Sequence, residues 1–574
     1  MRILYVPFFA TLLLCFSLPT QSLSGQNLLK NIGADSLLGT TDLGNSSPTA
    51  FTALNDNQFV FQGFVSPLET GNLHVSDGTE VGTQKLGDVQ AEGQMIRFRD
   101  RVYFAGTGFQ DGRALLGLWA TDGTVEGTEV VFESSVTTDS VPLEPANFFV
   151  LDTFLIFSGL TATHGTELWR TDGTAAGTEL IMDISPGIGS GFRGREPAVI
   201  DSIFYFTAST PDTGEEPWRT DGTEVGTWRI ADLNPGPVNS GAADYTGSGG
   251  YIYFSALVPG SGREVRRMTA AQGSPVELIG ENGGSTDSSN PRYFVDADGT
   301  LFWVAKSAGS DGFELRSYDH VGEPTVIEPT EIFPQILKPF GDGQVVFKGR
   351  DSGGRELWIS DGTTAGTRRI TDLYPGEGDG VFTNVSAESF HVYQDSLVFY
   401  AGSDGVAADG EFVYELFVTD GTEEGTRLIA DQAPGTAGTN PGNFFTFKDR
   451  VYFAASDPVV GREPFYLGPE DLLVSLREPA PKGLQLIAKP YPNPLRAGER
   501  FQLELSLEQR TKLIAGLYDI RGALVQEFPL PANGLRAGTH TIPLTLPDGA
   551  ASGTYLLRLA NATGAITLKL MVRE

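Results

Sequence analysis

Thiol groups are almost absent from this chain of 574 residues. The single cysteine, Cys15, lies in an N-terminal stretch in which Arg2 precedes a mostly apolar run over residues 3–18. A short apolar run after a basic residue, followed by small residues, is typical of a secretory signal peptide. We therefore predict a signal peptide over residues 1–25, with cleavage before Gln26. The exported chain then contains no cysteine, which excludes disulfide bonds and a thiol nucleophile.

Long apolar runs and positive charge are also scarce. No stretch after residue 18 is long and apolar enough to cross a membrane as a helix, so we predict no transmembrane helix in the mature chain. Lys and Arg number 40 against 72 Asp and Glu, which gives a formal net charge of -32. Such a surface repels phosphate backbones on average, and we predict no nucleic-acid partner.

Histidine is rare, and its positions do not form a metal-binding pattern. The five histidines are His74, His164, His320, His391 and His540. None of the spacings matches a zinc site, and we interpret His164 as a solvated loop residue. The segment Asp-Ala-Asp-Gly at residues 296–299 resembles part of an EF-hand loop but lacks the closing glutamate. We predict no cofactor and no metal, and leave calcium open as the alternative.

Glycine is abundant, with 71 residues, and many of them belong to a recurring motif. Residues 167–178 read Glu-Leu-Trp-Arg-Thr-Asp-Gly-Thr-Ala-Ala-Gly-Thr, and two eroded copies begin at Glu264 and Glu314. Near copies occupy residues 118–128, 216–227, 356–367 and 415–426, with a weaker one at 73–83 and a truncated one at 461–466. The aspartates of the complete copies are Asp77, Asp122, Asp172, Asp221, Asp361 and Asp420. The period is roughly 49 residues, close to the length of one four-stranded propeller blade.

Each period contains the signals of four short strands, here called a, b, c and d. An aromatic strand pair comes first, as at residues 147–150 and 154–157, and Glu-Leu-Trp-x-Thr forms the third strand. Asp-Gly supplies a turn that the aspartate side chain caps, and a short apolar strand such as residues 180–182 follows. We predict an all-β chain with a multi-bladed β-propeller of about eight or nine four-stranded repeats over residues 26–468.

The two ends of the repeat region complement each other. Residues 28–32 resemble the d strand at residues 180–184, so the region opens on an orphan d strand. It closes on a, b and c strands, the last of them at residues 463–465. Pairing of the two ends in one blade would close the ring and remove exposed strand edges.

The connections of such a ring emerge on two faces. The a–b and c–d turns lie on one face, and the c–d turns are nearly uniform. The b–c loops lie on the other face and differ in length and content, as residues 106–117, 161–166, 211–215 and 403–414 show. Variable loops on a rigid scaffold are where specificity is usually built, so we expect a ligand on the b–c face.

The composition changes after residue 468. Residues 469–483, with Pro469, Pro479 and Pro481, indicate a linker. From residue 484 to the end there are 10 basic and 7 acidic residues, so the excess negative charge belongs to the repeats. Short strand signals at residues 501–505, 513–518, 553–559 and 565–570 predict a small β-sandwich over residues 484–574.

The repeat resembles the ELWxxDGTxxGT repeat family of large secreted bacterial proteins, over most of the exported chain. The resemblance implies a repeat architecture and no particular activity. Two copies depart from the family pattern, because Arg266 and Arg316 stand where Trp is expected and no Asp-Gly-Thr follows. That departure puts regular blades at these two places in question.

The end of the chain is similar to the type A sorting domain of the type IX secretion system. Three ordered motifs carry the resemblance: Tyr-Pro-Asn-Pro at residues 491–494, Leu-Tyr-Asp-Ile-Arg-Gly at 517–522 and Gly-Thr-Tyr-Leu-Leu at 553–557, followed by a lysine in the last strand. The sorting-motif residues that it implies are Tyr491, Pro492, Asn493, Pro494, Gly522, Gly553, Tyr555 and Lys569. The resemblance implies passage through the periplasm and outer membrane, with the secretion machinery and its sortase as partners. The product is then secreted or anchored on the outer membrane surface.

Two functions of different classes follow. The first is a secreted or cell-surface binding or adhesion protein whose propeller face holds a glycan or protein ligand. The alternative is a secreted enzyme that acts on an extracellular polysaccharide through a pair of carboxylates from different blades. The acidic loops at residues 214–216 and 409–411 are the candidate positions for that pair. No catalytic pair can be named from the sequence, which favours the binding protein over the enzyme.

Overall fold

The computed structural model describes most of the chain. The described residues are 27–32, 46–64, 72–110, 113–133, 143–280, 288–307, 309–310, 312–327, 332–373, 378–381, 390–406, 412–423, 425–430, 438–457, 460–468, 484–491, 495–519, 524–531, 534–550, 553–561 and 564–573. The predicted signal peptide and the predicted linker therefore lie outside the described residues. No helix among the described residues has the length and apolar character that a membrane crossing requires.

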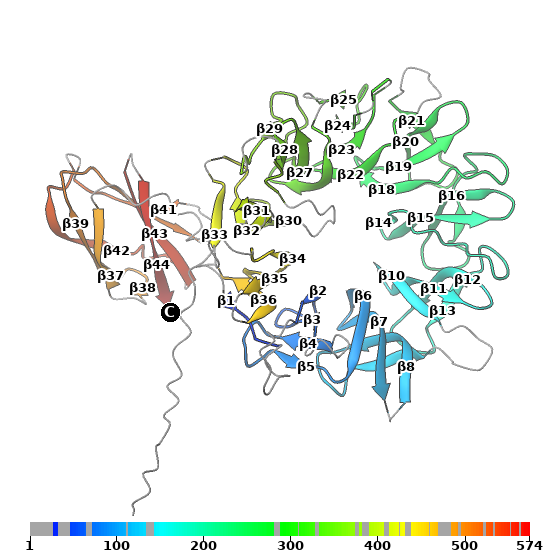
Figure 1. Cartoon of the computed structure of the whole chain (residues 1–574), viewed down its shortest axis with the longest axis horizontal. Coiled ribbons are helices and arrows are strands. Elements are labelled where there is room, and N and C mark those ends of the chain that lie inside the picture. The colour runs from blue at the N-terminus through cyan, green and yellow to red at the C-terminus, as the bar shows by residue number, and fades with distance from the viewer. Residues whose placement is uncertain are drawn as a thin grey trace, which may run out of the picture.

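Nine four-stranded antiparallel sheets are arranged in a ring, which confirms the predicted all-β propeller and sets its blade number at nine (Figure 1). We number the blades along the chain. Blade 1 consists of β2 (Thr49–Ala53), β3 (Phe59–Gly63), β4 (Asn72–Ser76) and β5 (Gln84–Lys85), and blade 2 consists of β6 (Val89–Phe98), β7 (Arg101–Gln110), β8 (Arg113–Thr121) and β9 (Glu129–Glu133). Blade 3 consists of β10 (Glu144–Leu151), β11 (Phe154–Thr161), β12 (Gly165–Thr171) and β13 (Glu179–Met182), and blade 4 consists of β14 (Ala198–Ile200), β15 (Ile203–Thr210), β16 (Gly214–Thr220) and β17 (Trp228–Arg229).

The next four blades follow the same order of strands. Blade 5 consists of β18 (Ala243–Ser248), β19 (Tyr251–Val258), β20 (Gly262–Met268) and β21 (Glu277–Ile279), and blade 6 consists of β22 (Arg292–Ala297), β23 (Thr300–Ala305), β24 (Glu314–Tyr318) and β25 (Thr325–Val326). Blade 7 consists of β26 (Gln335–Phe340), β27 (Gln344–Asp351), β28 (Gly354–Ser360) and β29 (Arg368–Arg369), and blade 8 consists of β30 (Phe390–Tyr393), β31 (Leu397–Val406), β32 (Phe412–Thr419) and β33 (Arg427–Ala430).

Blade 9 joins the two ends of the repeat region, as predicted. It contains β34 (Gly442–Phe447), β35 (Arg450–Asp457), β36 (Gly461–Leu467) and, as its outer strand, β1 (Asn27–Leu28). Beyond β1, the amide of Leu29 donates a hydrogen bond to the carbonyl of Pro464 at 2.9 Å, and Leu29 and Ile32 are buried. The edge of β36 is thereby covered, and the ring closes.

Aromatic b strands form the cores between neighbouring blades. In β11, residues 155–157 are fully buried, and Phe157 stands opposite Trp169 of β12. Phe157 also belongs to a cluster that contains Tyr103 and Leu118 of blade 2. Burial of such side chains between two sheets stabilises each blade only when its neighbour is present.

The inner a strands are bonded to one another around the ring. Thr52 Oγ1 of blade 1 donates to the carbonyl of Met95 in blade 2, and Gln94 Nε2 donates to the carbonyl of Phe148 in blade 3. Seven inner strands contain a β-bulge with a residue of positive φ: Ala50, Gly93, Asn147, Asp244, Tyr293, Ile336 and Asn443. Bulges of this kind bend a strand and re-aim its side chains.

The two eroded copies form complete blades, so the doubt raised by Arg266 and Arg316 is resolved in favour of regular sheets. β18 to β21 and β22 to β25 each pair in the usual order. Arg266 Nη2 donates to Ser261 Oγ, and Arg316 Nη2 donates to the carbonyl of Lys306. Each arginine thus binds its own b–c loop, and the backbone ladder needs neither the tryptophan nor the Asp-Gly-Thr turn.

The C-terminal residues form two small sheets around one core. The first contains β37 (Leu484–Tyr491), β39 (Arg500–Leu507) and β42 (Gly538–Thr545); the second contains β38 (Leu495–Arg496), β44 (Gly564–Arg573), β43 (Gly553–Asn561), β40 (Ile514–Asp519) and β41 (Leu524–Phe528). Phe501 and Leu505 of the first sheet share a buried cluster with Leu517 and Leu557 of the second. Two sheets that share one core are the arrangement of a β-sandwich.

Candidate functional site

The repeat motif builds one closed turn in each complete copy. In blade 3, Asp172 Oδ1 accepts hydrogen bonds from the amide and hydroxyl of Thr174 at 2.9 and 2.7 Å. The Thr174 hydroxyl accepts from the Gly177 amide at 3.0 Å, and Thr178 Oγ1 donates to the Thr174 carbonyl at 2.7 Å. The hydrogen bonds from Thr174 hold the pKa of Asp172 below its usual value. The same bonds to the aspartate recur at Asp77, Asp122, Asp221, Asp361 and Asp420.

The second glycine of the motif makes room for the aspartate. The carboxylate of Asp172 lies over Gly177 so closely that an added methyl group would collide with it. The equivalent glycines, each against its own aspartate, are Gly82, Gly127, Gly226, Gly366 and Gly425. The six aspartates are therefore turn residues whose side-chain hydrogen bonds stay within the motif.

A glutamate at the start of the c strand accepts hydrogen bonds from the d–a connection in six blades, and from Ser307 of the b–c loop at Glu314. Seven blades have this glutamate, always buried: Glu167, Glu216, Glu264, Glu314, Glu356, Glu415 and Glu463. Glu167 Oε1 accepts from the amides of Ser185 and Gly191 at 3.0 and 2.8 Å. Glu463 Oε2 accepts from the amide of Ile32 at 3.0 Å and from Ser46 Oγ at 2.6 Å, where the ring closes. The sequence-based prediction treated this glutamate only as part of a strand and missed its role.

Burial changes the acidity of these glutamates. It raises the pKa of Glu167 to about 7 and shifts the pKa values of Glu216 and Glu264 in the same direction. A carboxylate that accepts main-chain amides and has no solvent access is a structural anchor rather than a general acid. The glycine-rich segment at residues 187–191, which ends at one of the Glu167 donors, connects β13 to β14.

Of the two acidic loops proposed for catalysis, the structure describes only the one at residues 214–216. Glu216 is a buried anchor that accepts from the amide of Leu233 at 2.9 Å. Glu215 is paired with two exposed arginines, Arg193 at 3.4 Å and Arg195 at 2.6 Å. Residues 409–411 lie outside the described residues. The structure therefore tests only the first loop, in which Glu216 is a buried anchor and Glu215 is paired with arginines.

Another pair of carboxylates from two blades was not predicted. The amides of Asp244 and Tyr245 in blade 5 donate to the carbonyls of Arg195 and Glu196 at 3.3 and 3.2 Å, so the two segments lie side by side. Burial, together with the charge of Glu196, raises the pKa of Asp244 to about 6. No signal in the sequence could show this, because the pairing depends on the bulged inner strands of neighbouring blades.

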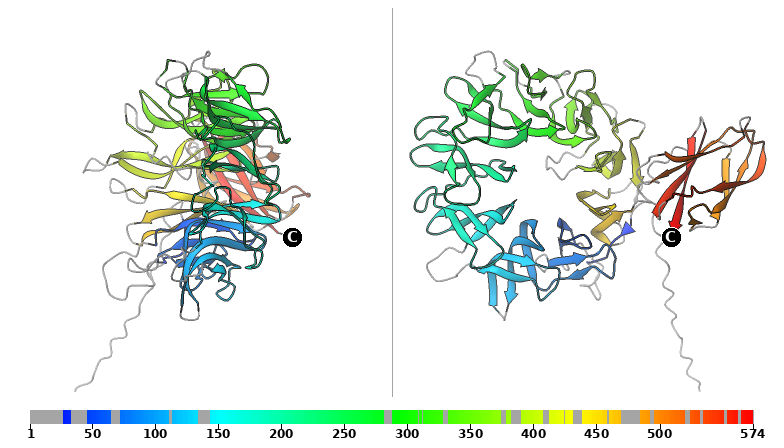
Figure 2. Two further views of the ribbon diagram at one scale, coloured as in Figure 1. Left: turned by 90° about the vertical axis from the view of Figure 1, so that its right-hand side faces the viewer. Right: turned by 180° about the vertical axis from the view of Figure 1, so that it is seen from behind.

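The b–c face is irregular, as predicted from its loops. The b–c hairpins of blades 2 and 8 are long, with β7 pairing to β8 as far as Gln110 and Arg113, and β31 pairing to β32 as far as Val406 and Phe412. In blade 3 the connection is a short turn between Thr161 and Gly165. The side view in Figure 2 shows the hairpin of blade 8 standing out from the ring.

The histidines of the described residues make separate contacts. His164 Nδ1 lies 2.9 Å from Thr163 Oγ1, and His540 Nε2 lies 2.7 Å from the carbonyl of Arg536. His74 stacks on Phe61 in blade 1, and His320 Nδ1 lies 2.8 Å from Tyr253 OH. Burial lowers the pKa of His391 to about 4.

Metal-ligating side chains do not converge in the part of the chain that the structure describes. No group of three or more histidine, cysteine, aspartate or glutamate side chains there could hold a metal ion. At the turn that resembles an EF-hand loop, Asp296 accepts hydrogen bonds from Ser248 Oγ and from the amide of Gly299. That aspartate therefore has a structural role between blades 5 and 6.

The sorting-motif residues are spread over the sandwich. Tyr491 ends β37 and pairs with Gln502 of β39. Gly553 and Tyr555 lie in β43, opposite Val572 and Leu570 of β44, which also contains Lys569. The remaining four, Pro492, Asn493, Pro494 and Gly522, lie outside the described residues.

The comparisons with known proteins concern the fold alone. No protein-family model and no curated protein sequence matches the chain. Among solved structures, a prolyl endopeptidase has 13% identity and a TM-score of 0.36 over 66% of this chain and 55% of its own. An acylaminoacyl peptidase of Pyrococcus horikoshii has 12% identity and a TM-score of 0.31 over 64% and 57%. The tricorn protease has 11% identity and a TM-score of 0.22 over 92% and 57%. This chain thus spans little more than half the length of each.

Proposed function

We propose that the protein is a binding or adhesion protein at the cell surface or in the medium, and that the b–c face of its ring holds a glycan or protein ligand. The observation that carries this proposal is the contrast between the two faces. On the c–d side, the aspartates, threonines and glycines of the motif are bonded to one another in the same way in six blades. On the b–c side, the hairpins differ from blade to blade. Differences of this kind on a rigid ring are a means of building specificity.

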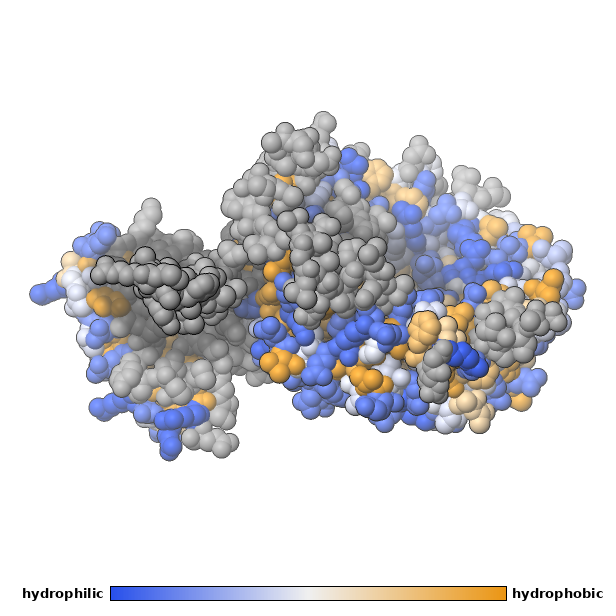
Figure 3. Space-filling model, turned by 60° about the horizontal axis from the view of Figure 1, so that its bottom comes forward, coloured by the Kyte–Doolittle hydropathy of each residue, from blue (hydrophilic) through white to orange (hydrophobic). Residues whose placement is uncertain are grey.

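The surface of the ring supports a polar or wet interface. In Figure 3 the apolar residues of the visible face are scattered among hydrophilic ones rather than gathered in one large patch. Of the most exposed aliphatic side chains, Val81, Val225 and Val321 lie in c–d turns and Ile188 lies in a d–a connection. Scattered apolar residues are normal for a soluble surface and mark no protein-binding patch by themselves.

Export by the type IX secretion system is part of the same proposal. Its support is the resemblance of residues 484–574 to type A sorting domains, together with the sandwich that these residues form. Under this proposal the sandwich directs the folded ring across the outer membrane, where the sortase removes the sandwich. The ring is then released or attached to the surface.

The binding proposal is tested with the purified full-length protein on an array of glycans and matrix proteins, with and without a calcium chelator. Replacing the blade 8 hairpin at residues 403–414 by the short blade 3 turn at residues 161–166 is expected to change the set of bound ligands. The matched control changes a c–d turn tip, replacing Glu224 and Val225 by the two alanines of blade 3, and should leave binding as it was. Unchanged binding after the hairpin exchange would contradict the proposal, and loss on chelation would add a metal.

A polysaccharide-cleaving enzyme is the second candidate, favoured by one observation. Asp244 and Glu196 come from neighbouring blades, and the raised pKa of Asp244 suits a proton donor. Incubation of the array glycans with the protein, followed by analysis of their length, tests this function. Glycans that the wild-type protein shortens and the Asp244→Asn variant leaves intact would establish the enzyme. Glycans that the wild-type protein leaves unaltered would exclude this activity for the tested substrates.

A further inference from the structure

The c–d turns dock onto the preceding blade through a main-chain carbonyl. At five boundaries, a side chain of one blade donates a hydrogen bond of 2.6 to 2.9 Å to a carbonyl oxygen of the next blade's turn. The pairs are Arg450 with Gly78, Arg99 with Asp172, Arg170 with Gly222, Ser317 with Gly362 and Arg368 with Gly421. Arg170 and Ser317 donate from the c-strand position that Arg219 occupies in blade 4, and in both cases the acceptor is a carbonyl oxygen.

The boundary between blades 4 and 5 lacks that oxygen. The turn of blade 5 has no Asp-Gly-Thr and instead closes through Thr269, whose amide and hydroxyl each lie 3.0 Å from Ser274 Oγ. Arg219 of blade 4 stands at the strand position that Arg170 has in blade 3. No hydrogen-bond acceptor for the Arg219 guanidinium is present among the described residues, and its Nε is buried.

In the described part of the chain, Arg219 also has no counterpart of the carboxylate that forms an ion pair with Arg170. Arg170 binds Glu179 of its d strand through Nε at 3.0 Å and Nη2 at 2.5 Å. In blade 4 the residue opposite Arg219 is Trp228, whose ring centroid lies 5.2 Å from the guanidinium carbon. The two acceptors of Arg170 are thus both missing for Arg219, and an aromatic surface stands in place of one of them.

A second polar group at this boundary has no partner. Tyr205, which pairs with Arg219 across the b and c strands, is 1% exposed, and its hydroxyl is buried without a hydrogen bond among the described residues. Burial raises the pKa of Tyr205, so the hydroxyl keeps its proton and can donate it. A buried hydroxyl without a partner is costly, so an acceptor bound beside Tyr205 would be stabilised by it.

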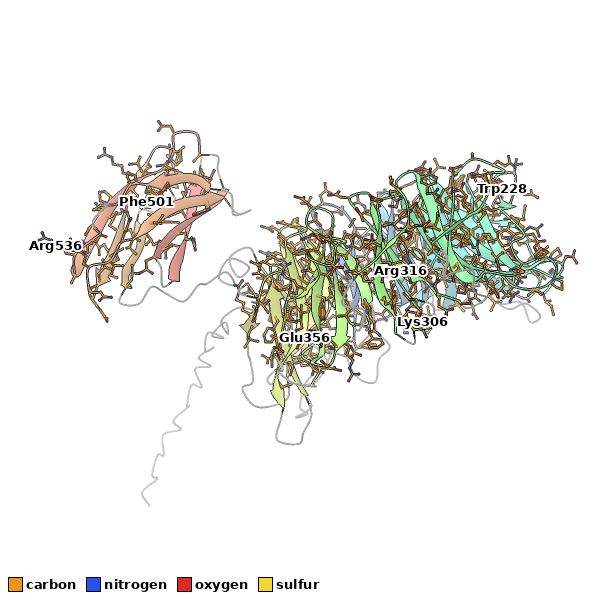
Figure 4. All side chains as sticks on the ribbon, turned by 90° about the horizontal axis from the view of Figure 1, so that it is seen from above. Trp228, Lys306, Arg316, Glu356, Phe501 and Arg536 are labelled. Atoms are coloured by element: carbon orange, nitrogen blue, oxygen red, sulfur yellow. The ribbon has the colours of Figure 1, made fainter. Side chains whose placement is uncertain are left out.

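These groups line one small cleft. Tyr205, Arg219, Trp228 and Ile230 of blade 4 face Met268 and the turn at residues 269–274 of blade 5. The cavity volume is about 10 Å³, enough for one water-sized group, and the exposed turn residues 269–273 leave its mouth open to solvent. With the ring seen edge-on in Figure 4, Trp228 lies toward the face opposite to that of Lys306, which follows a b strand. The cleft is therefore separate from the b–c face.

We propose that this cleft binds a carboxylate carried on a short apolar stem. The guanidinium of Arg219 matches the two oxygens of a carboxylate and would regain both of the acceptors that Arg170 has. The Tyr205 hydroxyl adds a donor, and Trp228, Ile230 and Met268 provide apolar walls for the stem. The cavity admits one oxygen of the carboxylate, so the rest of the ligand lies in the open mouth. Asp221 lies near enough that, against the opposing effect of burial, its bonds from Thr223 and the charge of Arg219 hold its pKa below the usual value. Its Oδ1 nevertheless accepts from Thr223, and no hydrogen bond joins it to Arg219 among the described residues.

The test compares a carboxylate with its neutral isostere on the full-length protein. Ligand-observed NMR titrations use propionate against propionamide, and the tripeptide N-acetyl-trialanine with a free C-terminus against its amide. If a peptide C-terminus can enter the cleft, we expect both carboxylates to bind and both amides to fail. If the cleft takes only a small free carboxylate, we expect propionate alone to bind. Arg219→Gln should weaken carboxylate binding about tenfold or more, because a hydrogen bond to a charged group is lost. Tyr205→Phe should weaken it less.

Arg170→Gln is the matched control, since that arginine already has both acceptors, and it should leave carboxylate binding unchanged. Thermal unfolding of each variant shows whether the fold is kept, and Tyr205→Phe still tests the site if Arg219→Gln does not fold. The proposal is overturned if propionate and propionamide bind alike, or if propionate fails to bind, which would mean that the cleft holds only water. Equal loss on Arg170→Gln and Arg219→Gln would overturn it as well.

Discussion

At the residue scale, the hydrogen bonds of the repeat motif join residues at very different separations in the sequence. The aspartate of each turn binds the threonine two residues later, and that threonine binds the glycine three residues further on. Because these contacts join residues only two or three positions apart, the residues keep a fixed spacing in every copy of the motif. The turn role of the aspartates could therefore be predicted from the sequence. Glu167 binds amides 18 and 24 residues away, in a connection whose sequence varies between blades. Its role became visible only in the structure.

Gly177→Ala tests the packing of the aspartate in the turn. The new methyl group would displace the Asp172 carboxylate and weaken its bonds to Thr174, so we expect a loss of about 1–3 kcal/mol in the free energy of unfolding. Denaturant unfolding of the full-length protein measures it. Gly442→Ala is the control, because its methyl group would meet only Arg462 Nη2, at 3.8 Å. Equal losses for both variants would show that the effect is not specific to the turn.

Glu167→Gln tests the effect of the buried glutamate on pH dependence. Burial raises the pKa of Glu167 in the folded protein to about 7, above the ordinary glutamate value of 4.5. Stability from this group is therefore fully present below pH about 4.5 and is lost as the pH rises through 7, by up to about 3 kcal/mol. The variant cannot ionise there, so its melting temperature should fall less than that of the wild type between pH 5 and 8. Glu126→Gln, at an exposed turn tip, should keep the wild-type slope; a parallel slope for Glu167→Gln would contradict the assignment.

At the element scale, the ring closes through one of its shortest strands. β1 has only two residues, yet Leu29 and Ile32 beyond it complete a core with Phe59 of blade 1 and Tyr452 of blade 9. The likeness of this segment to an ordinary d strand was enough to predict the closure. The expectation for the eroded copies was less successful, because the sheet depends on backbone pairing and buried b strands, whereas the family pattern mainly records turn and loop contacts.

Removal of residues 27–32 tests the closure. A chain that begins at residue 33 should leave the edge of β36 unpaired and the amide partner of Glu463 missing, and should unfold at a lower temperature than a chain that begins at Gln26. Two buried aliphatic side chains are lost, so we expect a decrease of at least about 2–5 kcal/mol in stability. An exposed edge also favours self-association, which light scattering would detect. Identical melting curves for the two chains would show that β1 does not hold the ring closed.

At the scale of the whole molecule, the ring and the sandwich differ in charge and in construction. The repeats contain the excess of acidic residues, whereas residues 484–574 have 10 basic and 7 acidic ones. Counting repeats and matching the two ends predicted eight or nine blades, and the structure has nine. The cleft between blades 4 and 5 could not be predicted, because it arises from a turn of one blade that fails to reach an arginine of another. Sequence repeats indicate what blades share, and binding sites appear where neighbouring blades differ.

The proposed export route leads to the last prediction. A fluorescent reporter placed between residues 1–25 and residues 469–574 should cross the outer membrane in a host with a type IX secretion system and stay in the periplasm of the same host without it. The motifs that resemble the sorting domain all lie in the attached segment, so no part of the ring is needed. The matched control is the protein ending at residue 483, which should remain periplasmic in both hosts although its ring is complete. Export of that truncated protein, or equal export of the reporter in both hosts, would separate the sandwich from secretion and leave it as an ordinary C-terminal domain.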